Sequence, residues 1–122
     1  MANKKEITTL ERVSALIEEQ ALTKDDLMGY LRQILEVRSL ENNISNLLGR
    51  AVLKGASHLY AGEEAVAVGA VGALKSDDLI TSTHRGHGHA HAHGDQAAKT
   101  DREKQTHFNK MMAEVLGKSG GY

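Results

Sequence analysis

The chain has 122 residues and a formal net charge of -1, with a sequence pI of about 6.6. This length suits one domain of ordinary size, and the near-neutral charge argues against a dedicated nucleic-acid-binding protein, which usually presents a strongly basic face. There are no cysteines, which excludes disulfides and thiolate metal sites and fits a cytoplasmic protein. The N-terminus lacks the apolar region of a signal peptide. The longest small-apolar run, residues 65–74, is too short to span a membrane.

Two helices are predicted in the first 49 residues. Residues 5–20 carry apolar side chains at helical spacing, and we expect residues 1–22 to form a helical extension. Thr23 opens a longer helix, with Asp25 and Asp26 in the first turn, where carboxylates oppose the positive helix end. We expect Gly49 to cap its C-terminus. Its apolar stripe should consist of Leu27, Leu31, Ile34, Val37, Leu40, Ile44, Leu47 and Leu48.

A third helix is expected after the connector at residues 50–62. It should begin near Gly62, with Glu63 and Glu64 in its first turn, and its interior is built of alanine, valine and glycine. Each glycine costs a helix roughly 1 kcal/mol relative to alanine. Such a sequence suits close approach by another backbone, but a weak alanine-rich helix fits the residues equally well.

The remaining elements are a turn, a strand and a last helix. Residues 76–78 predict a turn and residues 79–83 a short strand, which the histidine-rich segment follows directly. Thr100 and Glu103 form a capping-box pattern, and the helix that they open should end near Leu116, before Gly117. Its apolar side should be Phe108, Met111, Met112, Val115 and Leu116. A single strand has no ladder partner, so we expect its partner strands to lie outside this chain.

Four stretches, in this order, carry a resemblance to a known family. They are residues 38–41 (RSLE), 55–69 (GASHLYAGEEAVAVG), 78–88 (DLITSTHRGHG) and 111–118 (MMAEVLGK), the last followed by residues 120–122 (GGY). Together they resemble the N-terminal part of the alpha subunit of thiamine-diphosphate-dependent 2-oxoacid dehydrogenases. The acetoin dehydrogenase branch is the most similar, because of the His-Arg pair at 84–85 and the Gly-Glu-Glu-Ala stretch at 62–65. Pyruvate dehydrogenase alpha subunits commonly have Tyr-Arg in place of this His-Arg pair.

The resemblance implies roles for four residues. Arg85 matches the arginine that contacts the cofactor diphosphate, and a guanidinium offers phosphate a planar fork of donors. His84 matches the neighbouring cofactor-contacting position, and His87 matches the same cofactor-binding pattern. His58 matches a catalytic histidine beside the substrate, where an imidazole can donate a hydrogen bond or move a proton. Taken alone, His58 would be an ordinary loop residue and Arg85 a surface charge.

The alternating histidines 87, 89, 91 and 93 also raise a metal-binding hypothesis. In an extended segment all four would point the same way, and neutral imidazoles bind zinc, nickel or copper. The resemblance accounts for Arg85, His87 and the flanking glycines, which a metal site does not. We therefore assign no metal ligands and expect a loop that tolerates histidine at the other positions. Glu63 and Glu64 fit ordinary first-turn residues.

The resemblance implies an α/β fold, of which this chain would be the mostly helical N-terminal part. Residues 23–122 would form a thiamine-diphosphate-binding domain truncated at its C-terminus, because the family's Gly-Asp-Gly site for the cofactor's magnesium is absent and Gly94-Asp95-Gln96 does not replace it. The implied reaction is oxidative cleavage of acetoin or of a 2-oxoacid such as pyruvate, with acyl transfer to a lipoyl carrier. The chain alone is expected to be inactive.

The implied partners are a beta subunit, with which the family forms heterotetramers, and a lipoyl-bearing acyltransferase. No nucleic-acid or membrane partner is expected. Two alternatives stay open at this point: a non-catalytic helical remnant that keeps only a subunit-binding surface, and a small histidine-rich metal-binding protein.

Overall fold

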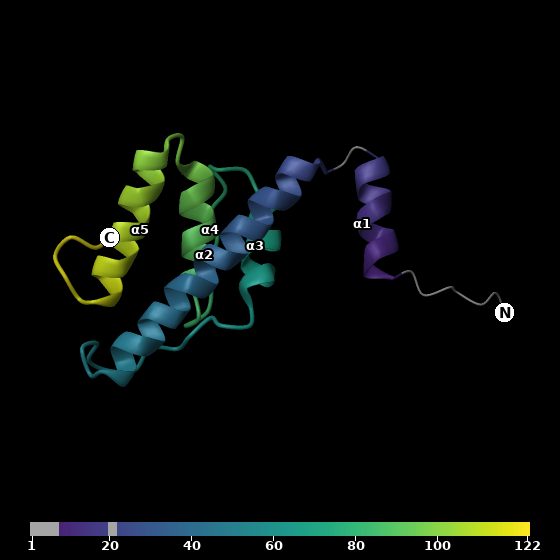
Figure 1. The fold of residues 1–122 in the computed structure, drawn as a ribbon. Coiled ribbons are helices and arrows are strands. Elements are labelled where there is room, and N and C mark those ends of the chain that lie inside the picture. Colours follow the sequence, from purple (N-terminus) through teal and green to yellow (C-terminus); the bar gives the residue numbers. More distant parts are fainter. Residues whose placement is uncertain (1–7, 20–21) are drawn as a thin grey trace.

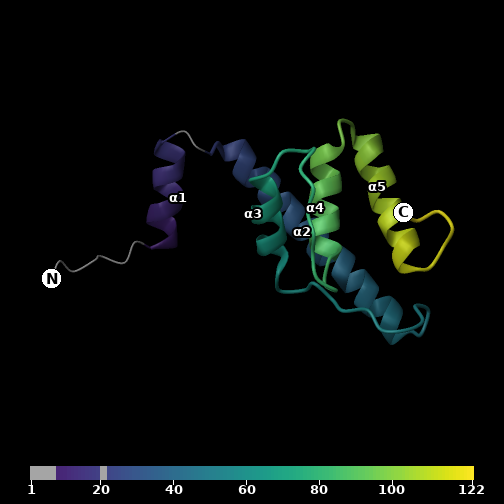
Figure 2. The same ribbon diagram turned by 180° about the vertical axis from the view of Figure 1, so that it is seen from behind.

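The computed structural model describes residues 8–19 and 22–122. Its helices are α1 (Thr9–Glu18), α2 (Lys24–Gly49), α3 (Glu64–Gly72), α4 (His87–Ala97) and α5 (Asp101–Val115). Helices α3, α4 and α5 lie side by side, and the long α2 crosses one face of this layer (Figures 1 and 2). Helix α1 lies beyond the N-terminal end of α2 and buries none of its side chains. No helix in the described ranges has both the length and the apolar character needed to cross a membrane.

Side-chain caps explain where the long helices begin. The Thr23 hydroxyl accepts from the Asp26 N–H at 3.1 Å, and the Asp26 carboxylate accepts from the Thr23 N–H at 2.8 Å. Thr100 and Glu103 form the same reciprocal pair at the start of α5. Both predicted starts are confirmed, since each box satisfies two N–H groups that lack helical partners. The predicted Gly49 cap is wrong, because Gly49 is the last helical residue and Arg50 is the cap.

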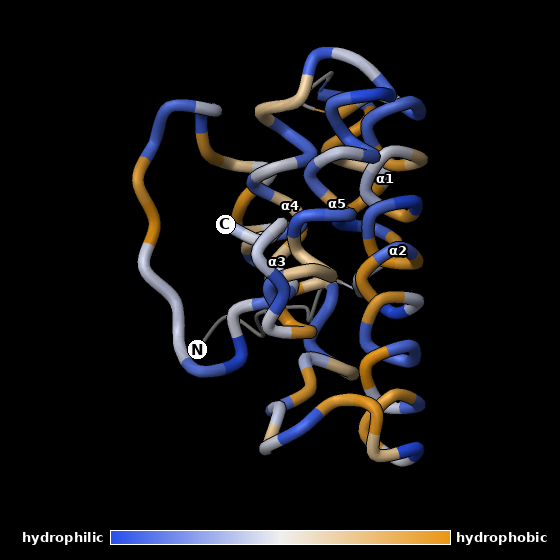
Figure 3. Tube along the Cα trace, turned by 90° about the vertical axis from the view of Figure 1, so that its left-hand side faces the viewer, coloured by the Kyte–Doolittle hydropathy of each residue, from blue (hydrophilic) through white to orange (hydrophobic). Residues whose placement is uncertain are grey.

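The core forms where α2 meets the other helices. Val37, Leu40 and Ile44 are fully buried, and apolar residues recur along α2 in Figure 3. The predicted apolar side of α5 packs against this stripe around buried Met111, as expected. Leu31 is not core, since it is 47% exposed. It shares a groove on the uncovered side of α2 with Met28 and Leu35, which are likewise exposed.

The strand predicted at residues 79–83 is wrong. The turn before it is confirmed, with the Asp78 N–H donating to the Lys75 carbonyl at 3.1 Å, but residues 79–83 are irregular. Every regular element in the described part of the chain is a helix, so these residues have no strand with which to form a ladder. The described residues are therefore mostly helical, and the expected α/β architecture is not seen in them.

The histidine segment is a helix, where the sequence predicted a loop. Helix α4 turns about 100° per residue, so successive histidines, two residues apart, point in nearly opposite directions, and the four do not share one face. Its Gly88 lies against α3, where an added Cβ would come 2.5 Å from a ring carbon of Tyr60 and 3.0 Å from the Ala67 Cβ. The close approach proposed for the small-residue helix is thus found, between Ala67 of α3 and Gly88 of α4.

Candidate functional site

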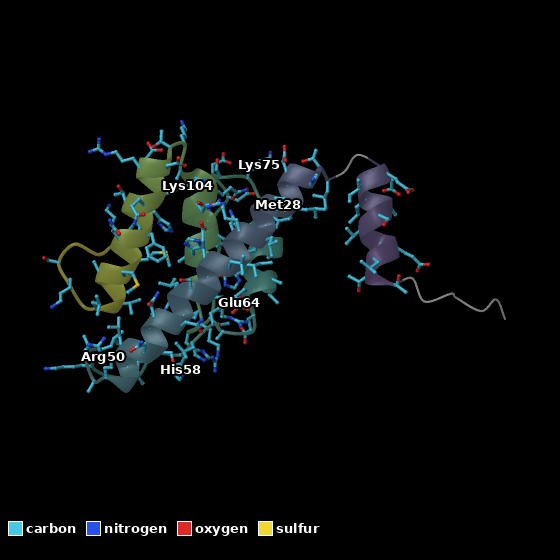
Figure 4. All side chains as sticks on the ribbon, viewed as in Figure 1. Met28, Arg50, His58, Glu64, Lys75 and Lys104 are labelled. Atoms are coloured by element: carbon cyan, nitrogen blue, oxygen red, sulfur yellow. The ribbon has the colours of Figure 1, made fainter. Side chains whose placement is uncertain are left out.

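The structure brings together the four residues singled out in the sequence. His58 lies on the connector before α3, His84 and Arg85 lie just before α4, and His87 is the first residue of α4. The rings of His58 and His84 meet edge to face, with centroids 4.7 Å apart. The Arg85 guanidinium donates to the carbonyl of Leu59. In Figure 4, His58 lies at the end of the molecule away from Lys75 and Lys104.

Glu41 joins the two segments that carry the cluster. Its side chain projects from α2 and is fully buried. One carboxylate oxygen lies 2.8 Å from Nδ1 of His87, and the other accepts from the Tyr60 N–H at 2.9 Å. The sequence pattern predicts no role for Glu41 beyond its place in the RSLE stretch. The available signal was its position between Leu40 and Ile44, on the face of α2 that faces the core.

A second buried carboxylate fixes the start of α3. Glu64 is 4% exposed and forms a two-pronged ion pair with Arg38, at 2.5 and 3.0 Å. It also accepts from the N–H of Gly62, whose positive φ of 101° suits glycine. The Arg38 hydrogen bond is the main cause that lowers the pKa of Glu64 to about 2. Glu64 is therefore more than a first-turn residue, because it anchors the turn after the His58 segment to α2.

The donors in the cluster suit an anion such as phosphate. A guanidinium has five N–H donors, so the bond from Arg85 to Leu59 leaves others for a ligand. His58 and His84 are exposed. Gly86, the N-cap residue of α4, makes no side-chain cap bond, which leaves the first backbone N–H groups of the helix free of a capping side chain. This combination of a cation, imidazoles and backbone donors fits a diphosphate.

The remaining histidines of α4 contact α2 and the segment between α3 and α4. His89 contacts the Ser82 hydroxyl at 3.1 Å, His91 contacts Glu36 at 3.0 Å, and His93 contacts the Asp78 carbonyl at 3.0 Å. Among residues 8–19 and 22–122, no three His, Asp or Glu side chains are grouped so that they could hold a metal ion. These three histidines therefore have separate partners.

The chain is similar to known dehydrogenase subunits. The family model described as "Dehydrogenase E1 component" matches residues 32–121. The alpha subunit of acetoin:2,6-dichlorophenolindophenol oxidoreductase from Bacillus subtilis is 42% identical over 104 residues, which is 85% of this chain and 28% of that protein. The subunit of the same name from Cupriavidus necator is 41% identical over 101 residues, 82% of this chain and 27% of that protein.

A pyruvate dehydrogenase E1 component subunit alpha, from Rhizobium meliloti, is 38% identical over 98 residues, covering 80% of this chain and 25% of that protein. No solved structure matches the chain. The chain thus spans only about a quarter of the length of these curated relatives. The match over residues 32–121, which contains all four clustered residues, shows that the chain belongs to the dehydrogenase E1 component family.

Proposed function

We propose that this chain acts as part of the alpha subunit of a thiamine-diphosphate-dependent dehydrogenase, with His58, His84, Arg85 and His87 facing the cofactor. The observation that carries the proposal is their convergence. The contacts between His58 and His84 and between Arg85 and Leu59 join segments that lie 26 residues apart in sequence. The family relationship supplies the cofactor class.

Each residue of the cluster would have a different role, set by its chemistry. Arg85 would grip the diphosphate through paired charge-assisted hydrogen bonds, assisted by the N–H groups at the start of α4. His84 would contact the cofactor beside it. His58 would donate a hydrogen bond or carry a proton next to the substrate. When bound, thiamine diphosphate supplies the carbanion chemistry, and the protein supplies orientation and electrostatics.

The substrate and the partners belong to the same proposal. The names of two relatives favour acetoin over a 2-oxoacid such as pyruvate. The designation "subunit alpha" favours a beta-subunit partner, and the family resemblance favours transfer of the acyl group to a lipoyl-bearing acyltransferase. We also infer that magnesium would be held by residues of the larger α/β domain, with residues 23–122 as one part of that domain and residues 1–22 as its extension. We also propose that the protein is located in the cytoplasm.

A second candidate is a non-catalytic chain that keeps only a subunit-binding surface. The observation that favours it is the exposed apolar stripe of Met28, Leu31 and Leu35 on α2, which are 56%, 47% and 60% exposed. Exposed apolar patches of this kind often mark protein interfaces.

A chimeric subunit separates the two candidates. The matching 104 residues of the Bacillus subtilis relative are replaced by those of this chain, the product is co-expressed with its partner subunit, and dye-linked acetoin oxidation is measured. We expect an active enzyme in which His58→Ala lowers turnover but changes the cofactor requirement little. His93→Gln, on α4 but bonded to Asp78, is the matched control and should leave turnover unchanged. An assembled chimera without activity would favour the second candidate.

A further inference from the structure

We propose that Glu41 is a positioning residue: it holds the His87 imidazole with its proton on Nδ1, so that Nε2 is left as a hydrogen-bond acceptor. The inference rests on the proposed function, because it specifies what His87 offers to the cofactor or substrate. It also separates His87 from Arg85, which can only donate.

The contacts of Glu41 limit where the proton can lie. Its carboxylate is fully buried, and one oxygen is already occupied as an acceptor of the Tyr60 N–H at 2.9 Å. The other oxygen lies 2.8 Å from Nδ1 of His87, within the range of a charge-assisted N–H···O⁻ bond. An ionised carboxylate accepts hydrogen bonds and donates none, so the shared proton belongs to His87 Nδ1.

The opposite edge of the imidazole is then the functional one. In the neutral ring, a proton on Nδ1 leaves a lone pair on Nε2. The His87 side chain is 21% exposed, so the ring reaches solvent although its Nδ1 edge faces a buried group. His87 would accept a hydrogen bond or a proton from an N–H or O–H of the bound molecule. This is acceptor chemistry, distinct from phosphate binding.

The same carboxylate also sets the position of His58. Tyr60 follows His58 by two residues, and its ring is buried against Gly88 of α4. Glu41 therefore holds the His58 segment and the start of α4 at a fixed spacing, from a single buried group. A change at this residue should disturb both histidines at once.

The tautomer can be read directly in this chain. The protein is labelled with ¹⁵N in its histidines, and long-range ¹H–¹⁵N spectra are recorded at pH 7.5, with the His87 signals assigned by their loss in His87→Gln. We expect a protonated Nδ1 and an unprotonated Nε2. In Glu41→Gln the amide oxygen can accept from Tyr60 while the amide NH₂ donates to Nδ1, so the proton of His87 should move to Nε2.

Glu36→Gln is the matched control, because Glu36 is also a carboxylate of α2 bonded to a histidine of α4. It should change the signals of His91 and leave those of His87 unchanged. Protonation of Nε2 in the unaltered chain, or unchanged His87 signals in folded Glu41→Gln, would overturn the inference. Should Glu41→Gln fail to fold, the tautomer of the unaltered chain alone decides. The two experiments can also disagree. If the unaltered chain has its His87 proton on Nδ1 but the chimeric enzyme is inactive, the proposed function is contradicted and the inference about Glu41 is not.

Discussion

The Glu64 carboxylate is buried while its Arg38 partner remains 49% exposed. Hydrogen bonds to charged groups contribute about 1.5–3 kcal/mol, and the exposure of Arg38 reduces this through solvent screening. We expect Glu64→Gln to lower the free energy of unfolding by about 1–2 kcal/mol in urea titrations at pH 7. Because the pKa of Glu64 falls from 4.5 to about 2, this contribution is complete above pH 4.5 and is lost as pH falls toward 2.

Glu63→Gln is the control for that experiment. Glu63 is the neighbouring glutamate, is exposed, and makes no side-chain cap bond at the start of α3. Glu63→Gln should leave the free energy of unfolding within about 0.5 kcal/mol of that of the unaltered chain, as surface substitutions usually do. Equal losses for Glu63→Gln and Glu64→Gln would contradict the assignment of a structural role to Glu64.

His107 makes the contact between α4 and α5 sensitive to pH. Burial, and then the neighbouring charge of His91, lower the pKa of His107 below its usual 6.5. Its neutral form is therefore favoured in the fold, so its stabilising effect is complete above pH 6.5 and is lost as pH falls toward the lowered value. The melting temperature should fall more between pH 7.5 and 5.5 in the unaltered chain than in His107→Gln. Parallel pH profiles would exclude His107 as the cause.

At the scale of the elements, the contact between α3 and α4 depends on Gly88. Alanine there would force its Cβ to 2.5 Å from a carbon of the Tyr60 ring, and Tyr60 is only 1% exposed. We expect Gly88→Ala to lower the free energy of unfolding by about 1–3 kcal/mol, a typical cost of overpacking.

Gly69 supplies the comparison in the same pair of helices. It lies inside α3, and an added Cβ would meet nothing within 4 Å. Gly69→Ala should raise the free energy of unfolding by about 0.5–1 kcal/mol, because alanine loses less backbone entropy on folding. Urea unfolding of both variants measures the contrast. If both changes stabilise the chain, the close approach of α4 to α3 is wrong.

Helices with strong local signals were predictable, and those that depend on tertiary contacts were not. Reciprocal caps at Thr23 and Thr100 are encoded within four residues, which is why both starts were predicted correctly. Helix α4 consists mainly of glycine, alanine and histidine, so it lacks a clear apolar stripe and is held by partners on other segments. The strand at 79–83 failed because β-propensity alone cannot supply a ladder.

The candidate site shows the same division between local and long-range information. His58, His84, Arg85 and His87 were selected by family resemblance, and the structure places them in one cluster. Glu41 and Glu64 were missed as anchors because a glutamate on a helix usually faces solvent. Their burial depends on which face of α2 or α3 meets the rest of the fold, which one sequence does not specify.

For the whole molecule, the dispersed histidines predict weak metal binding. The α4 histidines have separate partners, and the described residues offer no three-ligand group. Zinc titration followed by thermal unfolding should therefore show little stabilisation. A native-state site at 100 times its Kd would add about 2.7 kcal/mol, and a gain of that size would revive the metal-binding hypothesis.

The central claim is that Arg85 and its neighbours bind the diphosphate of the cofactor. The most direct measurement is how the activity of the chimeric enzyme depends on the thiamine diphosphate concentration. The unaltered chimera is compared with its Arg85→Lys variant. Lysine keeps the charge but loses the two-pronged geometry, so the concentration for half-maximal activity should rise about tenfold or more. Arg102→Lys, on the exposed first turn of α5, is the control and should leave the half-maximal cofactor concentration unchanged. An unaltered cofactor dependence in Arg85→Lys would contradict the claim.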